Sequence, residues 1–278
     1  MNFAAYCQLD AVNASSLKAA AVSPLHYHYG LTHERPDTAA MAKGRAIHCA
    51  TLEPDELPRR YTVWKDARRG KPWTEFSDDA ADAGLEILTQ AEYDDVLATR
   101  DAVRAHPVAA RYLLAGHAEE TITWVDHDTD LPCKARIDFI TPGNVIVDLK
   151  TAAGIDPYTF EKQTEKLLYY MSAAHYLNGM QAITGEDWRF VFIAVKSTPR
   201  HAVRCGPLSE DARYCGEQEV ARLLRMVADC TDSGEWPEAY PDEDTFDLPA
   251  WFYAQEGRDG DAEIKILEGL APHMEVSS

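Results

Sequence analysis

Two carboxylates and one ammonium group occur in a short stretch of the sequence from which they can reach a common point. Asp148 and Lys150 are two residues apart in an apolar run, so on a strand both side chains project from the same face. Asp138 lies on the preceding alternating segment, and a tight turn over 142–144 would place it opposite Asp148. Because an unpaired charge is costly to bury, a cation is expected beside Asp148.

This pattern of groups suits hydrolysis of a phosphodiester. Mg²⁺ typically binds one or two carboxylates together with water and phosphate. Such an ion can generate hydroxide and stabilise the charge that builds on a scissile phosphate. Lys150 can orient or help deprotonate the attacking water, or neutralise the phosphate, and its charge offsets repulsion between the carboxylates. The alternative interpretation of the tripeptide alone is a solvated charge pair on a strand.

The elements that must position these residues follow from hydrophobic periodicity and capping signals. Alternation over 133–140 places Ile137 and Phe139 on one face and Arg136 and Asp138 on the other. The other predicted strands are 120–125, 144–150, 188–196 and 201–205. The predicted helices are 39–53, 89 to about 105, 107–114, 156–178 and 209 to about 230.

An ordered set of segments resembles the PD-(D/E)XK nuclease superfamily, and within it phage and prophage exonucleases of the exodeoxyribonuclease VIII (RecE) type. The resembling segments are the opening helix motif at 15–18 and 23–27, the histidine-bearing helix at 44–54, the first core hairpin at 120–124 and 131–138, the signature strand at 145–151 and the following helix at 169–177. The resemblance spans roughly 13–207, which is most of the chain.

The resemblance implies roles for individual residues. Asp138 and Asp148 would be metal ligands, and Lys150 would be the catalytic lysine. His48 would be an additional metal ligand brought from the N-terminal helix. Glu120 stands where the family often has an acidic residue, which binds the metal directly or through water. Its neighbour Glu119 is the alternative for that position.

Three positions depart from the family pattern. Ile137 replaces a proline, which concerns the backbone and changes little. Ser172 stands where the family commonly has a glutamine, and the shorter side chain puts DNA positioning or support of the lysine in doubt. Lys196 occupies a position where an acidic residue is frequent, so it is not assigned to the site.

The net charge constrains how such a protein could hold DNA. The chain has 27 basic and 46 acidic residues and a net charge of −19, which argues against broad nonspecific binding to nucleic acid. Any DNA must therefore contact a local basic channel. The predicted contacts are Arg68, Arg69 and Lys71 of the basic segment 65–71, together with Arg136. A solvated loop is the alternative interpretation of that segment.

The predicted fold is a restriction-endonuclease-like α/β core, in which a mixed central sheet is flanked by helices, with a helical N-terminal elaboration. A chain of 278 residues can bury a substantial core. We expect a single nuclease domain over 1–235, with a helical N-terminal region over 1–116 and a catalytic core over 117–235. The acidic, proline-containing segment 236–278 is expected to be a tail.

Composition also limits cofactors and location. The six cysteines form no CxxC pair and no cluster with histidines, so zinc and iron–sulfur sites are disfavoured, including that of the iron–sulfur nucleases of the superfamily. The sequence has no apolar run of roughly 20 residues and no secretory signal, so a cytoplasmic protein without membrane contact is expected.

The resemblance implies a Mg²⁺-dependent double-stranded DNA exonuclease, with Mn²⁺ as a substitute ion. It would act on DNA ends from 5′ to 3′ and leave 3′ single-stranded tails for a single-strand annealing recombination protein. Relatives assemble as homo-oligomeric rings, and a ring would confine the basic surface to its inner wall. The alternatives are a catalytically silent DNA-binding or assembly protein on the same fold, and an endonuclease of the same superfamily.

Overall fold

The computed structural model describes residues 3–33 and 36–239, together with Thr245 and Asp247. The chain divides into two compact units, 1–239 and 240–278. All but a few residues of the predicted tail therefore lie outside the described residues, and the described helices and strands belong to the first unit. Within it, no helix combines the length and the apolar character needed to span a membrane.

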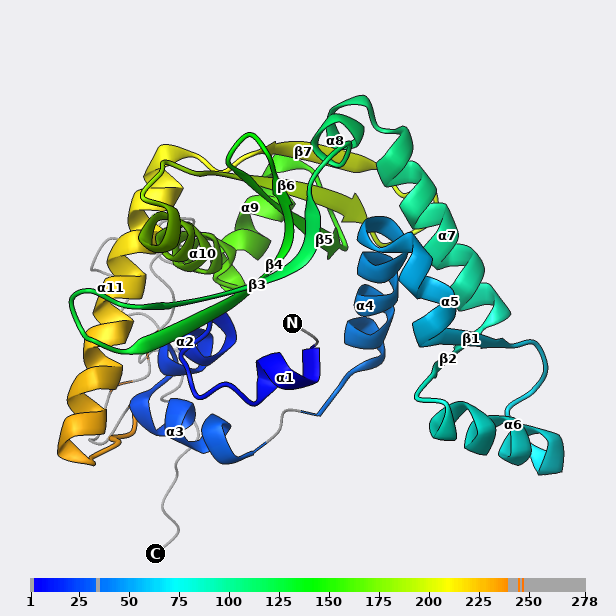
Figure 1. Ribbon diagram of the computed structural model, residues 1–278, viewed down its shortest axis with the longest axis horizontal. Helices are drawn as coiled ribbons and strands as arrows, with labels where there is room; N and C mark the ends of the chain where they lie inside the picture. Colours follow the sequence, from blue (N-terminus) through cyan, green and yellow to red (C-terminus); the bar gives the residue numbers. More distant parts are fainter. Residues whose placement is uncertain (1–2, 34–35, 240–244, 246, 248–278) are drawn as a thin grey trace, which may run out of the picture. The chain divides into compact units, whose positions relative to one another are not determined.

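A five-stranded mixed sheet forms the centre of the unit (Figure 1). Its strands are β3 (His117–Val125), β4 (Pro132–Thr141), β5 (Val145–Ala152), β6 (Arg189–Lys196) and β7 (Val203–Pro207), in the spatial order β3-β4-β5-β6-β7. Neighbouring strands are antiparallel except β5 and β6, which are parallel. This mixed sheet flanked by helices confirms the predicted α/β fold class.

Two helical layers cover the sheet (Figure 1). The helices before the sheet are α1 (Phe3–Cys7), α2 (Ala14–Ala20), α3 (Pro24–Thr32), α4 (Ala39–Leu52), the 3₁₀ turn η1 (Pro54–Glu56), α5 (Leu57–Arg60), α6 (Gly70–Asp82), α7 (Gln90–Ala105) and α8 (Pro107–Tyr112). Those after β5 are α9 (Pro157–Lys166), α10 (Tyr169–Thr184) and α11 (Glu210–Ser233). One core joins the sheet to α2, α10 and α11, and a second joins it to α4 and α7.

Local capping chemistry starts the helices where the sequence predicts. Thr38 accepts a hydrogen bond from the backbone N–H of Met41 at 3.2 Å and begins α4. Thr89 and Glu92 form a reciprocal capping box, in which the Glu92 carboxylate accepts from the Thr89 backbone N–H at 2.7 Å. These predictions hold because a cap involves only neighbours in the sequence.

The N-terminal region is mostly helical and also contains two strands that the sequence does not predict. Two short strands, β1 (Tyr61–Trp64) and β2 (Glu86–Thr89), pair in parallel, and α6 connects them. Each has only four residues, which is too short to show a clear alternation in the sequence. The basic segment 65–71 is the connection from β1 into α6, in the region of Figure 1 away from β4 and β5.

The single helix predicted over 156–178 is two helices in the structure. Asp156 caps the start as predicted, but the helix is interrupted at Leu168, whose φ of 52° lies in the left-handed region. The second helix continues through Gly179 and ends at Gly185. A Cβ at Gly179 would lie 2.6 Å from the Trp124 ring, so this glycine permits close packing of α10 on the sheet and does not end a helix.

The sheet branches where β4 separates from β5. The ladder between them covers Phe139 to Thr141, whereas β5 continues alongside β6 to its end. At the start of β4 the N-terminal segment takes the free edge, because Val12 donates to the carbonyl of Pro132 and accepts from Lys134, both at 2.8 Å. Asp138 lies at the branch point between these two pairings.

Close packing of α10 against α11 makes a stability prediction at Gly216. A Cβ there would lie 2.5 Å from the Tyr170 carbonyl oxygen and 2.9 Å from Ala174. We expect Gly216→Ala to lower the free energy of unfolding by about 1–2 kcal/mol, because overpacking outweighs the gain in helix propensity. Urea unfolding measures this change. Gly44→Ala is the control, since nothing lies within 4 Å of its added Cβ, and it should not destabilise. A Gly216→Ala protein as stable as the parent would contradict the packing argument.

Candidate active site

Asp138 and Asp148 come together where β4 and β5 diverge. Continuing the register of Phe139 opposite Val147 by one residue sets Asp138 opposite Asp148, as the predicted turn requires. The branch leaves the backbone N–H of Leu149 without a ladder partner on β4, and it donates to the Asp138 carboxylate at 2.9 Å. Asp148 itself is buried, with 3% of the residue exposed.

Lys150 forms an ion pair with Asp148, and 2.5 Å separates its Nζ atom from Oδ2. Burial works against the ammonium charge, yet the carboxylates of Asp148 and Asp138 outweigh it and raise the pKa of Lys150. The lysine therefore stays protonated at neutral pH. In this state it can donate hydrogen bonds and neutralise charge.

The charged form of Asp138 is disfavoured by its surroundings. Burial raises the pKa of its carboxyl group, and the nearby negative charge of Asp148 adds to this, while His48 works in the opposite direction. Two carboxylates so close together in a buried place favour an added positive charge. A divalent cation would offset the repulsion between the two carboxylates more strongly than the single charge of Lys150 does.

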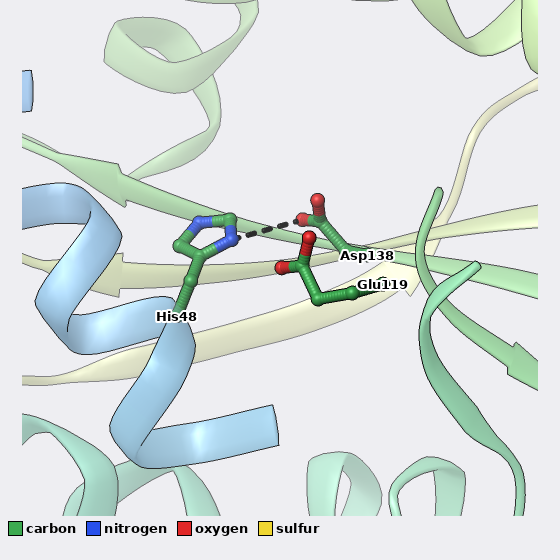
Figure 2. Close-up of side chains that lie close together, drawn as sticks. All are labelled: His48, Glu119 and Asp138. Atoms are coloured by element: carbon green, nitrogen blue, oxygen red, sulfur yellow. Dashed lines mark ion pairs between the residues drawn. The ribbon is translucent and has the colours of Figure 1, made fainter. Parts of the chain in front are cut away.

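His48, Glu119 and Asp138 each direct one ligand atom toward the same point (Figure 2). The three atoms lie within 4.8 Å of one another, and the His48 Nδ1 atom lies 3.4 Å from Asp138 Oδ2. The three residues come from α4, β3 and β4, so only the folded chain assembles them. One imidazole and two carboxylates fit a small divalent ion such as Mg²⁺ or Mn²⁺.

The acidic residue of β3 that joins this group is Glu119, whereas Glu120 is exposed and points elsewhere. The structure therefore places the alternative acid, Glu119, beside Asp138, and which of the two acids binds a metal stays a prediction. Glu119 has a φ of 53°, in the left-handed region. This backbone conformation interrupts the alternation of side chains along β3. Ala118 and Ile122 are four residues apart and would share a face of a regular strand, yet Ala118 packs with the α4 core and Ile122 with the α10 core.

Arg136 is part of the site and is not presented to solvent. Its Nε donates to the Glu119 carboxylate at 2.7 Å, and its side chain is only 12% exposed. The sequence suggested a DNA contact for Arg136. The structure places the guanidinium against a candidate metal ligand instead.

The remaining predicted DNA contacts lie outside this site. Arg68 donates to the carbonyl of Ile87 at 3.1 Å and lies over the Trp73 ring, while Lys71 pairs with Glu75. Arg69 is exposed at the start of α6. All three belong to the region of the chain built from β1, α6 and β2, which Figure 1 shows away from β4 and β5.

The Tyr169 ring lies beside two lysines, Lys150 and Lys18, and the sequence pattern does not reveal this arrangement. The Nζ atoms of Lys150 and Lys18 each lie 5.2 Å from the centre of its ring. Gln163 donates to the Tyr169 hydroxyl at 3.2 Å. Ser172, on the same helix, donates to the carbonyl of Leu168 at 3.2 Å, so it bonds within its own helix and not to Lys150.

One solved structure supports this fold, and a second is similar over a smaller part of its geometry. A candidate exonuclease from Eubacterium rectale superposes with a TM-score of 0.59 at 14% sequence identity, over 88% of this chain and 92% of that one. A phage-related exonuclease from Haemophilus somnus 129PT gives a TM-score of 0.35 at 13% identity, over 81% and 96% of the two chains. A comparison with curated proteins finds no match.

The family assignment comes from the sequence as a whole. The model of the family described as "PDDEXK-like domain of unknown function (DUF3799)" matches residues 13–243. This range includes His48, Glu119, Asp138, Asp148 and Lys150. The mixed sheet is the core expected of a PD-(D/E)XK nuclease fold, and the aspartate and lysine of the signature strand are present on β5. The chain therefore belongs to this PDDEXK-like family and to the PD-(D/E)XK nuclease superfamily.

Proposed function

We propose that this protein is a divalent-metal-dependent exonuclease acting on double-stranded DNA. The observation that carries the proposal is the cluster at the β4–β5 branch, formed by His48, Glu119, Asp138, Asp148 and Lys150. A nuclease of this superfamily needs carboxylates for a metal and a cation near the phosphate. Both kinds of group meet here, where the pairing of β4 with β5 ends.

The residues divide the chemical work between them. A divalent cation held by His48, Glu119 and Asp138, with Asp148 beside them, would stabilise negative charge on the scissile phosphate and lower the pKa of a bound water. Lys150, kept protonated by the carboxylates, donates a hydrogen bond to the phosphate or orients the attacking water. Asp148 holds the lysine in place through their ion pair.

The finer parts of the proposal rest on the resemblance to RecE-type exonucleases. They are the use of Mg²⁺ with Mn²⁺ as a substitute, degradation from 5′ to 3′, release of 3′ tails to a single-strand annealing protein, and assembly as a homo-oligomeric ring. A net charge of −19 agrees with a ring or cleft, because DNA can then approach only where basic residues and the metal are concentrated.

Digestion of labelled DNA tests the function. Linear duplex carrying a label on either the 5′ or the 3′ end is incubated with Mg²⁺, with Mn²⁺ or with EDTA. We expect early release of a 5′ label as mononucleotides or short fragments, no reaction in EDTA and no cutting of closed circular duplex. Cutting of the circle would establish an endonuclease instead. Intact linear DNA together with little or no Mn²⁺ binding would support the catalytically silent alternative.

The basic segment 65–71 supplies a prediction about DNA binding. We expect Arg68→Gln together with Arg69→Gln to weaken binding of duplex DNA and to reduce the slope of log K against log salt, by about 0.9 for each phosphate that is no longer neutralised. Binding is measured with Ca²⁺ at several salt concentrations, by fluorescence anisotropy. Metal affinity should not change, because these residues lie outside the metal cluster.

The matched control for this double substitution is Arg222→Gln with Arg225→Gln on α11. Both arginines are exposed, and the control alters the net charge by the same amount. If the 68/69 variant binds DNA as the parent does at every salt concentration, the segment is only a solvated loop. The DNA path would then be sought near Lys18 and Lys150.

A further inference from the structure

We propose that Arg136 is a positioning residue, which holds the Glu119 carboxylate in the orientation needed to bind the metal. This inference rests on the proposed metal site, and it adds a residue to that site for which the sequence predicts a different role. Arg136 would act through Glu119 and would touch neither the metal nor the DNA. Four features of the structure support it.

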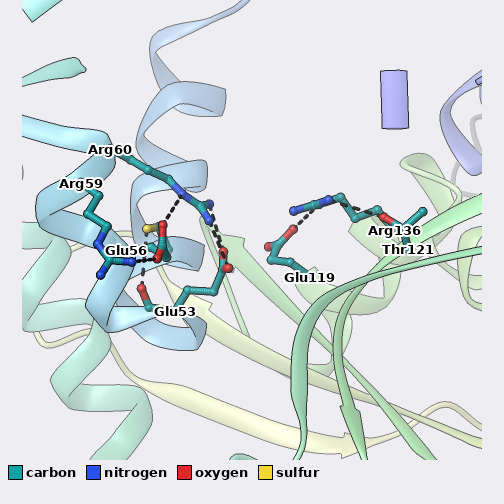
Figure 3. Close-up of polar contacts among 8 residues, drawn as sticks. Glu53, Glu56, Arg59, Arg60, Glu119, Thr121 and Arg136 are labelled. Carbon is teal, nitrogen blue, oxygen red and sulfur yellow. Dashed lines mark hydrogen bonds and ion pairs between the residues drawn. The ribbon is translucent and has the colours of Figure 1, made fainter. Parts of the chain in front are cut away.

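The first feature is the contact itself (Figure 3). Arg136 Nε lies 2.7 Å from Glu119 Oε2, and the side chains are only 12% and 19% exposed. A charge-assisted hydrogen bond at this distance, sheltered from solvent, is stronger than an exposed ion pair. Arg136 Nη1 also lies 3.5 Å from the Thr121 hydroxyl, so a second residue of β3 steadies the guanidinium.

The second feature is the unusual backbone of Glu119. A residue other than glycine with a φ of 53° carries strain of about 1–3 kcal/mol, which persists only when the surroundings fix it. The register of β3 and β4 passes from Ala118 opposite Phe139 to Glu120 opposite Ile137, so Glu119 and Asp138 lie between these pairs, and their carboxylate oxygens lie within 4.8 Å of each other. The positive charge of Arg136 offsets the repulsion between the two carboxylates and keeps Glu119 beside Asp138 when no metal is bound.

The third feature is the register of β4. Arg136 and Asp138 are two residues apart on the same strand, and Arg136 stands opposite Thr121. The strand thus supplies both a metal ligand and the residue that orients a second ligand on β3. Support from a rigid strand pair defines a ligand's position more closely than support from a loop would.

The fourth feature is the covering of this section of β4 by the N-terminal segment. The Phe3 ring lies 5.8 Å from the Arg136 guanidinium carbon. Lys134, two residues earlier on the strand, is buried and donates to the carbonyl oxygens of Tyr6 at 3.0 Å and Leu9 at 2.6 Å. Contacts on both sides of Arg136 favour a role inside the protein over a contact with a DNA phosphate.

Metal titration without DNA tests the inference. Mn²⁺ binding is measured by calorimetry for the parent, Arg136→Gln, Glu119→Gln and the double variant. We expect Arg136→Gln to weaken Mn²⁺ binding by about 10–100-fold, the usual effect of losing a residue that orients a ligand. The two substitutions should be strongly non-additive, because Arg136 acts only through Glu119. A contact with a DNA phosphate would leave this affinity unchanged.

Two further variants keep the test decisive. Arg136→Lys retains the positive charge but loses the planar guanidinium, so we expect its Mn²⁺ affinity to lie between those of the parent and Arg136→Gln. The lysine variant replaces the glutamine variant in the test if Arg136→Gln does not fold. Arg222→Gln breaks a more exposed arginine–glutamate pair, with Glu219 on α11, where Nε donates at 2.9 Å. This variant should bind Mn²⁺ as the parent does.

The outcomes separate this inference from the proposed function. If Glu119→Gln loses Mn²⁺ binding while both Arg136 variants bind it normally, the positioning role is wrong and the metal site stands. Additive losses in the double variant would also overturn the role. If the parent protein binds no Mn²⁺ at all, the proposed metal-dependent function is wrong and the inference is overturned with it.

Discussion

Replacement of Asp148 by alanine is expected to abolish phosphodiester cleavage while the protein remains folded. Asp148 follows the last residue of β5 that pairs with β4, and it forms the ion pair that holds Lys150. Its loss removes a carboxylate beside the proposed metal ligands and releases the lysine that is proposed to act on the phosphate. Several kcal/mol of transition-state stabilisation disappear, and about 4 kcal/mol corresponds to a roughly 1000-fold slower reaction. The measurement is the initial rate of label release from linear duplex.

Folding must be shown separately for this variant. Removing one partner of a buried ion pair can lower stability, so circular dichroism and the thermal midpoint are measured beside the rate. Asp148→Asn preserves the volume of the side chain and should be equally inactive. Asp128→Ala, an exposed aspartate in the β3–β4 turn, is the matched control and should keep parental activity. A folded Asp148→Ala protein with parental rates would refute the assignment of the site.

Glu119→Gln is expected to impair metal binding and cleavage, whereas Glu120→Gln, one position away, is expected to leave both unchanged. Glu119 lies with His48 and Asp138, so its substitution should weaken Mn²⁺ binding at least about tenfold and slow cleavage roughly 100-fold. Glu120 is exposed, and its substitution should change neither quantity. The two variants have the same net charge and nearly the same volume, so each is a control for the other.

The result decides which acidic residue serves the metal. Loss of binding in the Glu120→Gln protein with normal binding in the Glu119→Gln protein would restore the residue favoured by the sequence motif. It would also show that the left-handed backbone at Glu119 is not kept when metal binds. Calorimetry without DNA separates this effect from any change in DNA affinity.

Motifs made of neighbouring residues were predictable from the sequence. Thr38 and Thr89 start helices because a capping side chain bonds to backbone groups only a few residues away. Asp148 and Lys150 share a face because side chains alternate along any strand. Asp138 and Asp148 each lie one residue beyond the last pair of β4 and β5, and this follows from one short turn between adjacent strands.

Helix ends were predicted wrongly from the sequence where contacts with distant parts of the chain, and not neighbouring residues, set the backbone. Gly179 looks like the end of a helix, but it lies inside α10 because the Trp124 ring approaches it closely. Leu168 carries no signal for a break, yet its left-handed backbone separates α9 from α10. Nothing in the neighbouring residues reveals either feature, since the packing around each is set by the sheet.

The amino-acid sequence by itself determined the strand pair that carries Asp138, Asp148 and Lys150, because alternation and a tight turn act over a few residues. Only the tertiary structure decided that Glu119, and not Glu120, faces Asp138, since the left-handed backbone reverses the expected side. It also decided that Arg136 turns to Glu119 and not to solvent. Such choices depend on the packing of α1 and α4 around the branched sheet, and residues that are distant in sequence meet there only after the chain has folded.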